Sequence, residues 1–250
     1  MKNILIFCLL AIPVISFAAD DKQPERIADG WTMTPKDGHV KEFQEALAAH
    51  MKFRESKNDP REWHVYRPVT GDKLNTYIIR SCCHEWADQD SYIEWGDKAG
   101  TQKHFNETVD PHVQSYSHNY TVMDSENSHW PKGTVANYVG VSNIIAKSGA
   151  RQQMNRAIKA MTTVAKEHKW DHAWSFSYPV GGSVDVAMAT PFENYADMAP
   201  LEENFYKFVV RVLDSEDKAN KMFDDYSSTI ESSTYHIYRH DKKLSMSNDK

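Results

Sequence analysis

Hydrophobic side chains recur with helical spacing in two parts of the chain. Over residues 39–54 they return every three or four positions, at Val40, Phe43, Leu47 and Met51. The same spacing returns over residues 154–165. Side chains spaced in this way share one face of a helix, so each segment predicts an amphipathic helix that packs on a core.

Strand-like segments surround both predicted helices. A short run rich in aromatic residues follows each helix, ends at a Pro-Val-x-Gly turn and is followed by an apolar return, which predicts β-hairpins at 63–82 and 174–189. A second helical region follows in each half, well marked in the second and interrupted by Gly96 and Gly100 in the first. Alternating segments open and close the halves, at 27–34, 116–123, 137–146 and 235–239. Each half therefore has the predicted order β-α-β-β-α-β.

The two halves also match residue by residue. At an offset of 111 positions Trp63 meets Trp174, and the turn that begins at Pro68 meets the turn that begins at Pro179. Chance rarely preserves both features in one register, so we predict a duplicated unit of about 110 residues.

The order β-α-β-β-α-β is that of a ferredoxin-like unit, whose sheet carries helices on one face only. Two such sheets packed face to face cover each other. We therefore predict an α+β chain of two tandem ferredoxin-like units packed sheet to sheet. The predicted boundaries are a signal peptide at 1–18, a first unit at 19–124, a linker at 125–134, a second unit at 135–241 and a flexible tail at 242–250.

The N-terminal residues predict a secretory signal peptide. Lys2 precedes an apolar stretch from Ile4 to Phe17, and small residues favour cleavage after Ala18, with Ala19 as the alternative. We expect a periplasmic or secreted protein that has no membrane association after cleavage. Loss of Lys2 takes the formal charge from -6 to -7, and this acidic balance argues against nucleic-acid binding. A hydrophobic content of 40% excludes a disordered chain.

After cleavage the chain keeps two cysteines, the adjacent Cys82 and Cys83. Consecutive Cα atoms lie about 3.8 Å apart, below the roughly 4.4–6.8 Å that disulfides usually span. The simpler interpretation is a pair of small buried hydrophobic side chains. A redox pair and an intermolecular bridge are the alternatives.

The chain as a whole resembles a known superfamily. Two fused βαββαβ units of this size resemble the dimeric α/β-barrel proteins, and the segment from Glu107 to Tyr116 is similar to the helix-to-last-strand passage of antibiotic-biosynthesis-monooxygenase-like members. The resemblance implies an intramolecular dimeric α/β barrel. Its members include cofactor-free oxygenases of activated aromatic substrates, haem-degrading and haem-binding enzymes, and isomerases of small acids, so the fold leaves the function open.

Haem chemistry is one implication of this resemblance. Haem-degrading members use an Asn on the first strand with a Trp and a His on the second helix. Trp95 and His104 match the last two in the first half, where Thr32 stands in place of the Asn. Asn143 matches in the second half, where the helical region 201–226 contains no His. Neither half matches in full, so we expect no cofactor, with haem as an alternative.

Metal binding has no support from motifs. The twelve histidines include no His-Glu-x-x-His pair, and no paired Cys-x-x-Cys is present. The cluster from Cys82 to Glu85 would point successive side chains to opposite faces of a strand. We therefore expect no metal site.

Strand alternation predicts a different candidate site. Trp63 and Val65 share one face of their strand, and His64 and Tyr66 share the other. The second half repeats the aromatic face and carries serines on the other, so the repeated face is predicted as core and the differing face as the place for a pocket. A His beside a Tyr and an Arg can abstract a proton and hold the resulting anion.

We accordingly predict His64, Tyr66 and Arg80 as catalytic residues. The candidate substrate-binding residues are His118, Asn143, His236, Trp95 and His104. The alternative for the whole set is a group of hydrogen-bonded polar residues with no chemical role.

The leading functional prediction is an exported small-molecule-binding protein. Its enzymatic form would be a cofactor-free monooxygenase or isomerase that acts on a small aromatic or apolar substrate. The alternatives are a non-catalytic periplasmic binding or scaffold protein and a haem-binding protein. We expect a monomer, because the second sheet that covers the first belongs to the same chain.

Overall fold

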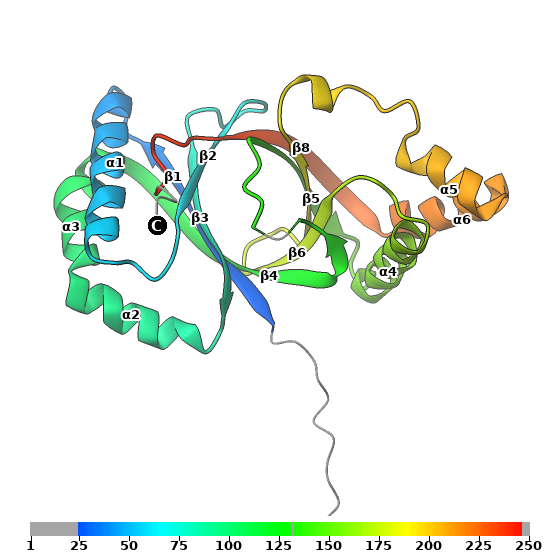
Figure 1. Ribbon diagram of the computed structural model, residues 1–250, viewed down its shortest axis with the longest axis horizontal. Coiled ribbons are helices and arrows are strands. Elements are labelled where there is room, and N and C mark those ends of the chain that lie inside the picture. Colours follow the sequence, from blue (N-terminus) through cyan, green and yellow to red (C-terminus); the bar gives the residue numbers. More distant parts are fainter. Residues whose placement is uncertain (1–24, 132, 247–250) are drawn as a thin grey trace, which may run out of the picture.

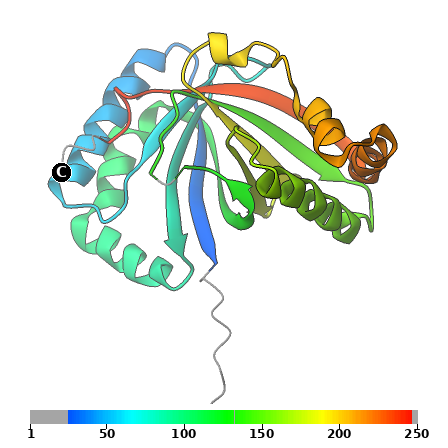
Figure 2. The same cartoon turned by 45° about the vertical axis from the view of Figure 1, so that its right-hand side comes forward.

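The computed structural model describes residues 25–131 and 133–246, so the predicted signal peptide lies outside the described residues. Eight antiparallel strands close into a barrel between two groups of helices (Figure 1). Figure 2 shows the same arrangement from a second direction, with α1, α2 and α3 on one side of the barrel and α4, α5 and α6 on the other.

Both halves follow the predicted order of elements. The first half consists of β1 (Arg26–Pro35), α1 (Val40–Ser56), β2 (His64–Pro68), β3 (Tyr77–Glu85), α2 (Asp88–Ala99), α3 (Thr101–Thr108), η1 (Asp110–His112) and β4 (Val113–His129). The second half consists of β5 (Tyr138–Ala146), α4 (Arg151–Glu167), β6 (Trp174–Val180), β7 (Val186–Phe192), η2 (Ala196–Met198), α5 (Phe205–Leu213), α6 (Glu216–Ser227) and β8 (Ile230–His240). The second helical region is divided in both halves, and in the first half the division is at Gly100, whose φ of +73° suits glycine.

The strands follow one another around the barrel in the order β1-β3-β2-β8-β5-β7-β6-β4, and β4 pairs with β1 to close it. Four neighbouring strands come from each half. The pairs β2–β8 and β4–β6 join the halves. The predicted α+β class is thus confirmed. The strands of both halves form one closed eight-stranded barrel, and closure pairs the strand edges that two separate sheets would have left open.

Alternate residues of the strands face the helices or the inside of the barrel, which we call the lumen. In the first half Trp63 and Val65 pack with Phe43 and Leu47 of α1. In the second half the corresponding core lies between the sheet and α4 and includes Phe176. The face that repeats between the halves is therefore core, as predicted, and the intervening residues face the lumen.

Two predicted boundaries are wrong. Leu244 and Met246 are buried in the core of the first half, and the Met246 amide donates to the Trp63 carbonyl. The tail predicted from residue 242 is therefore ordered as far as 246, because two apolar side chains in a polar segment are enough to dock it; residues 247–250 lie outside the described residues. The predicted linker is shorter than 125–134, since β4 continues to His129.

Candidate functional site

Three predicted site residues meet in the lumen. His64 and Tyr66 extend from β2, and Arg80 lies opposite His64 on β3. His240 of β8 joins them across the β2–β8 pair, with its ring centroid 5.2 Å from that of His64 and 5.1 Å from that of Tyr66. We call these four residues the lumen cluster. Sequence reasoning missed His240, because nothing in the sequence shows which strands of the two halves pair.

Burial sets the charge of the lumen cluster. It lowers the pKa of His64, an effect that Glu62 opposes from 3.3 Å and Arg80 reinforces. Burial, reinforced by His64, lowers the pKa of His240 to about 4. Burial also raises the pKa of the Tyr66 phenol. At neutral pH the cluster therefore holds neutral imidazoles and a neutral phenol beside the guanidinium of Arg80.

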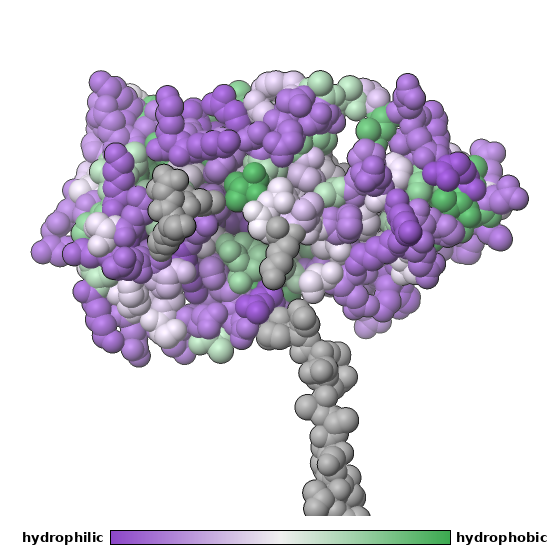
Figure 3. Space-filling view, viewed as in Figure 1, coloured by the Kyte–Doolittle hydropathy of each residue, from purple (hydrophilic) through white to green (hydrophobic). Residues whose placement is uncertain are grey.

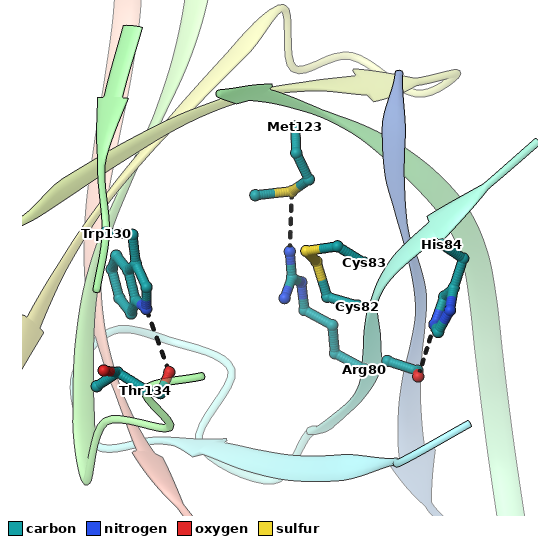
Figure 4. The surroundings of a disulfide bond; sticks show 8 residues. Arg80, Cys82, Cys83, His84, Met123, Trp130 and Thr134 are labelled. Carbon is teal, nitrogen blue, oxygen red and sulfur yellow. Dashed lines mark hydrogen bonds between the residues drawn. A yellow bond between two sulfur atoms is a disulfide. The ribbon is translucent and has the colours of Figure 1, made fainter. Parts of the chain in front are cut away.

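The side chain of Arg80 extends from β3 inside the lumen, past β1, to β4. Its Nη2 donates to the sulfur of Met123 on β4 at 3.2 Å, and the bond between Cys82 and Cys83 lies beside it (Figure 4).

The two cysteines form a disulfide across a cis peptide bond, with their Cα atoms 3.1 Å apart. The simpler interpretation of two small buried hydrophobic side chains is therefore wrong, because the two sulfur atoms are bonded and Cys83 is exposed.

Two further predicted residues face the lumen from the second half. Asn143 of β5 lies between Ala187 of β7 and Thr234 of β8 in register. His236 of β8 lies against the turn between β2 and β3, where a Cβ on Gly71 would come within 2.2 Å of its Nδ1. Within residues 25–131 and 133–246, no hydrogen bond, ion pair or ring contact joins either residue to the lumen cluster, so the structure does not assemble all the predicted residues into one site.

The remaining predicted residues lie on the helix side of the sheet. His118 Nε2 donates a 2.8 Å hydrogen bond to the carboxylate of Asp29, and its ring centroid lies 4.3 Å from that of Trp31. Trp95 of α2 and His104 of α3 pack among the helices. The prediction that His118 shares a sheet face with His64 is wrong, because residues on neighbouring strands share a face only according to register, and the sequence does not show the register. Trp95 and His104 are helical residues and do not line the lumen.

A polar network fills the space between sheet and helices in the first half. Trp63 Nε1 donates to the Tyr92 hydroxyl at 3.0 Å, and that hydroxyl donates to Asp59 at 3.2 Å. Arg54 pairs with the fully buried Asp59 at 2.7 Å. Burial raises the pKa of Tyr92 to about 12, so the phenol stays neutral. This network links Trp63 of the sheet side to Tyr92 of α2 by a direct hydrogen bond.

The second half has a cavity in the corresponding place. Trp174, the repeat partner of Trp63, donates instead to the Asn127 carbonyl at 2.8 Å, and no network crosses from it to α5. The resulting space of about 800 Å³ is open to solvent on one side and has largely apolar walls, which include Met161, Ala165, Trp170, Trp174, Phe176, Met188, Phe205 and Tyr226. We call it the second-half cavity. Apolar side chains also come to the surface beside α5 and α6 (Figure 3).

Few polar groups line this cavity. His172 lies at its wall, with its ring 4.6 Å from Trp170. Burial raises the pKa of Tyr226 to about 12. Two carboxylates complete the titratable groups: Glu193 accepts from Asn137 at 2.8 Å, and Asp197 accepts from the amide of Glu193 at 3.0 Å. Sequence reasoning missed the cavity, because a cavity depends on how side chains from different elements pack, and the sequence does not show this packing.

Among residues 25–131 and 133–246, no group of three or more His, Cys, Asp or Glu side chains is arranged to hold a metal. His172 is an imidazole of the kind that ligates haem iron. The charged side chains of the cavity wall are carboxylates, however, and they would repel the two propionates of haem. The residues of the second-half cavity therefore do not fit haem.

Comparisons with known proteins show the fold. No protein-family model matches the chain, and no curated protein matches it. A candidate monooxygenase of Lactobacillus acidophilus NCFM has a similar structure, with 10% identity and a TM-score of 0.55 over 86% of this chain and 94% of that chain. A chlorite dismutase mutant of Candidatus Nitrospira defluvii matches with 8% identity and a TM-score of 0.52, over 87% and 92%.

An anthrone oxidase-like protein also matches, with 10% identity and a TM-score of 0.51 over 88% of this chain and 92% of that chain. At these identities the likeness shows a shared fold and nothing about activity. No helix in the part of the chain that the structure describes is both long and apolar enough to cross a membrane.

Proposed function

We propose that this protein binds a small aromatic or other apolar molecule in the second-half cavity. The observation that carries the proposal is the open space of about 800 Å³ between β6, β7 and α4. Ligand pockets measure about 300–1,000 Å³ and have mostly apolar walls with a few polar groups. At the equivalent place in the first half a hydrogen-bonded network links Trp63 to α2, so we propose one ligand for each chain.

The charged residues of the cavity wall also indicate which ligand charge the cavity would accept. Glu193 and Asp197 stand at the cavity, and the lining contains no Lys or Arg. An anionic ligand would meet two carboxylates in a partly desolvated place, where like charges repel strongly. We therefore propose a neutral or cationic ligand.

A cofactor-free monooxygenase or isomerase is the enzymatic form of this proposal. Both reactions begin when a base removes a proton from an activated carbon or phenol. His172 is the imidazole on the cavity wall and is the base we propose. His64, Tyr66 and Arg80 do not line this cavity, so the catalytic roles predicted for them remain a prediction for a ligand in the lumen. A non-catalytic binding protein is the second candidate, and it needs only the cavity.

The binding proposal is tested with a neutral fluorescent probe, N-phenyl-1-naphthylamine, and its anionic counterpart, anilinonaphthalene sulfonate. We expect the neutral probe to bind with quenching of the cavity tryptophans and the anionic probe to bind at least tenfold more weakly. Met188→Trp places a large ring in the cavity and should abolish binding, with Thr190→Phe as a second blocking variant. Val40→Trp, at an exposed position of α1, is the control. Unchanged binding in both blocking variants would refute the site.

The enzymatic form is tested separately. Oxygen uptake, or interconversion of isomers, is measured with activated phenols that bind in the cavity. We expect His172→Gln to remove turnover and to keep probe binding. Binding without turnover in the unmodified protein would support the non-catalytic candidate.

We further propose that the protein is exported, arose by duplication and acts as a monomer. The apolar N-terminal stretch and the disulfide between Cys82 and Cys83 support export to an oxidising compartment. The equal order of elements in both halves supports duplication. Both halves of the barrel come from one chain, which supports a monomer. N-terminal sequencing of the exported protein tests the first of these proposals, and cleavage after Ala18 is the expected result.

A further inference from the structure

The lumen holds a positive charge that has no negative partner. Arg80 takes part in none of the ion pairs among the described residues. Its guanidinium donates a hydrogen bond to the thioether of Met123, which is a weak acceptor, whereas a guanidinium has five N–H donors. A buried guanidinium is costly unless a carboxylate or several hydrogen bonds compensate it.

Arg80 is partly exposed inside the barrel. Protein surrounds Arg80 closely enough that burial lowers its pKa, yet the residue keeps an intermediate exposure. The lowered pKa and the partial exposure are consistent with a guanidinium that is surrounded by protein but open to the interior of the barrel. The neighbouring strand contributes small residues there, with Gly30 opposite Arg80 and Ala28 opposite Cys82.

The two lumen imidazoles each leave one nitrogen unpartnered. The Ser245 hydroxyl donates its hydrogen to the Asp241 carbonyl, so His240 Nε2 must donate to Ser245 Oγ, 2.9 Å away. His64 Nε2 faces the Glu62 carboxylate at 3.3 Å and is a donor as well. Nδ1 of each neutral ring is therefore an acceptor, and both are buried without a partner among the described residues.

Nδ1 of His64 or of His240 can accept a proton when an anion binds beside Arg80. Glu62 favours the charged form of His64, and Arg80 opposes it. For His240, Lys242 and His64 oppose the charged form, and Asp241 favours it. An anion beside Arg80 would remove part of this opposition, so binding and protonation would reinforce each other.

We propose that the lumen is a binding site for a small monovalent carboxylate, held by the guanidinium of Arg80 and accompanied by a proton on His64 or His240. A guanidinium presents a planar fork of donors that matches the two oxygens of a carboxylate. One guanidinium compensates one negative charge. The site is separate from the second-half cavity and does not depend on the function proposed for it.

Isothermal titration of the whole protein with sodium formate and sodium acetate tests this site. Chloride replaces the carboxylate at equal ionic strength in the reference, and two buffers of different ionisation enthalpy count the protons. We expect saturable binding with net proton uptake that increases as the pH falls from 7.5 to 6. Equal heats from chloride, or no saturable heat, would overturn the proposal.

Variants assign the binding to Arg80. Arg80→Met should weaken formate binding at least tenfold and remove the proton uptake, and it should fold because it deletes an unpaired buried charge. Arg80→Lys keeps the positive charge but loses the planar pair of donors, so we expect its formate binding to lie between that of the unmodified protein and that of Arg80→Met. If Arg80→Met does not fold, Arg80→Lys alone tests whether Arg80 holds the carboxylate. Arg151→Met, at an exposed position of α4, is the matched control. Formate binding that survives both Arg80 variants overturns the assignment, and Met188→Trp should leave formate binding unchanged.

Discussion

Acid should destabilise this protein through His50, which is buried on α1 with 4% of its surface exposed. Its Nδ1 lies 3.1 Å from Nδ1 of His104, and Arg54 Nη1 lies 3.4 Å from its Nε2. Arginine only donates, so Nε2 of His50 accepts and Nδ1 carries the hydrogen. A second proton would have to be placed on Nε2, facing the guanidinium. Burial, with Arg54 and His104 reinforcing it, lowers the pKa of His50 to about 3.

The direction of the pH effect follows from this pKa. The folded pKa lies below the unfolded value of about 6.5, so the unfolded chain binds the proton more readily. The contribution of neutral His50 to stability is complete above pH 6.5 and is lost as the pH falls towards 3. Between pH 7 and pH 5 the loss is about 2 kcal/mol, since pH 5 lies about 1.5 pH units below the unfolded pKa and each unit is worth about 1.4 kcal/mol.

Urea unfolding at pH 7 and pH 5 measures this loss. In His50→Gln the titrating group is absent, so the drop in the free energy of unfolding between the two pH values should be smaller by about 2 kcal/mol than in the unmodified protein. His168→Gln, at an exposed position, controls for the loss of a histidine as such. Equal drops in the unmodified protein and in His50→Gln would refute the reasoning. The result does not depend on whether the folded pKa is 3 or 4, because pH 5 lies above both.

Four further results are expected. Leu244→Ala should lower the free energy of unfolding by about 2–4 kcal/mol because it empties a buried place in the first-half core; a loss no larger than that of the exposed Leu74→Ala would contradict the docking of the tail. Asp59→Asn should cost about 3–5 kcal/mol in the same assay, since Arg54 then keeps a buried charge without its partner, while Asp97→Asn at an exposed position should cost little. Alkylation followed by mass spectrometry should label Cys82 and Cys83 only after reduction, and labelling without a reductant would exclude the disulfide. Light scattering should give the mass of one chain, and a dimer mass would contradict the proposed monomer.

The order of elements could be read from the sequence because it depends on local periodicity. The helix spacing at Phe43 and Leu47 and the alternation around Trp63 each reflect how neighbouring residues meet one core face. Those patterns hold in the structure, where these residues are buried. The prediction that His64 and Tyr66 face away from that core has the same basis.

Local periodicity does not show which residues form the lumen cluster. His240 joins His64 only because β8 pairs with β2, and His118 leaves the group only because of the register between β1 and β4. Pairing and register are decided by contacts between residues far apart in the chain, which single-strand periodicity does not contain. The tail shows the same limit, since Leu244 is buried by a core that other elements build.

The sequence by itself determined the alternation of helices and strands, the matching of the two halves and the division between a repeated aromatic face and a variable polar face. The tertiary structure decided that the strands close into one barrel, that Arg80 lies in the lumen without a carboxylate and that the second half holds a cavity where the first half holds a hydrogen-bonded network. The physical reason is that periodicity follows from local backbone geometry, whereas charge compensation and empty space depend on which distant side chains meet.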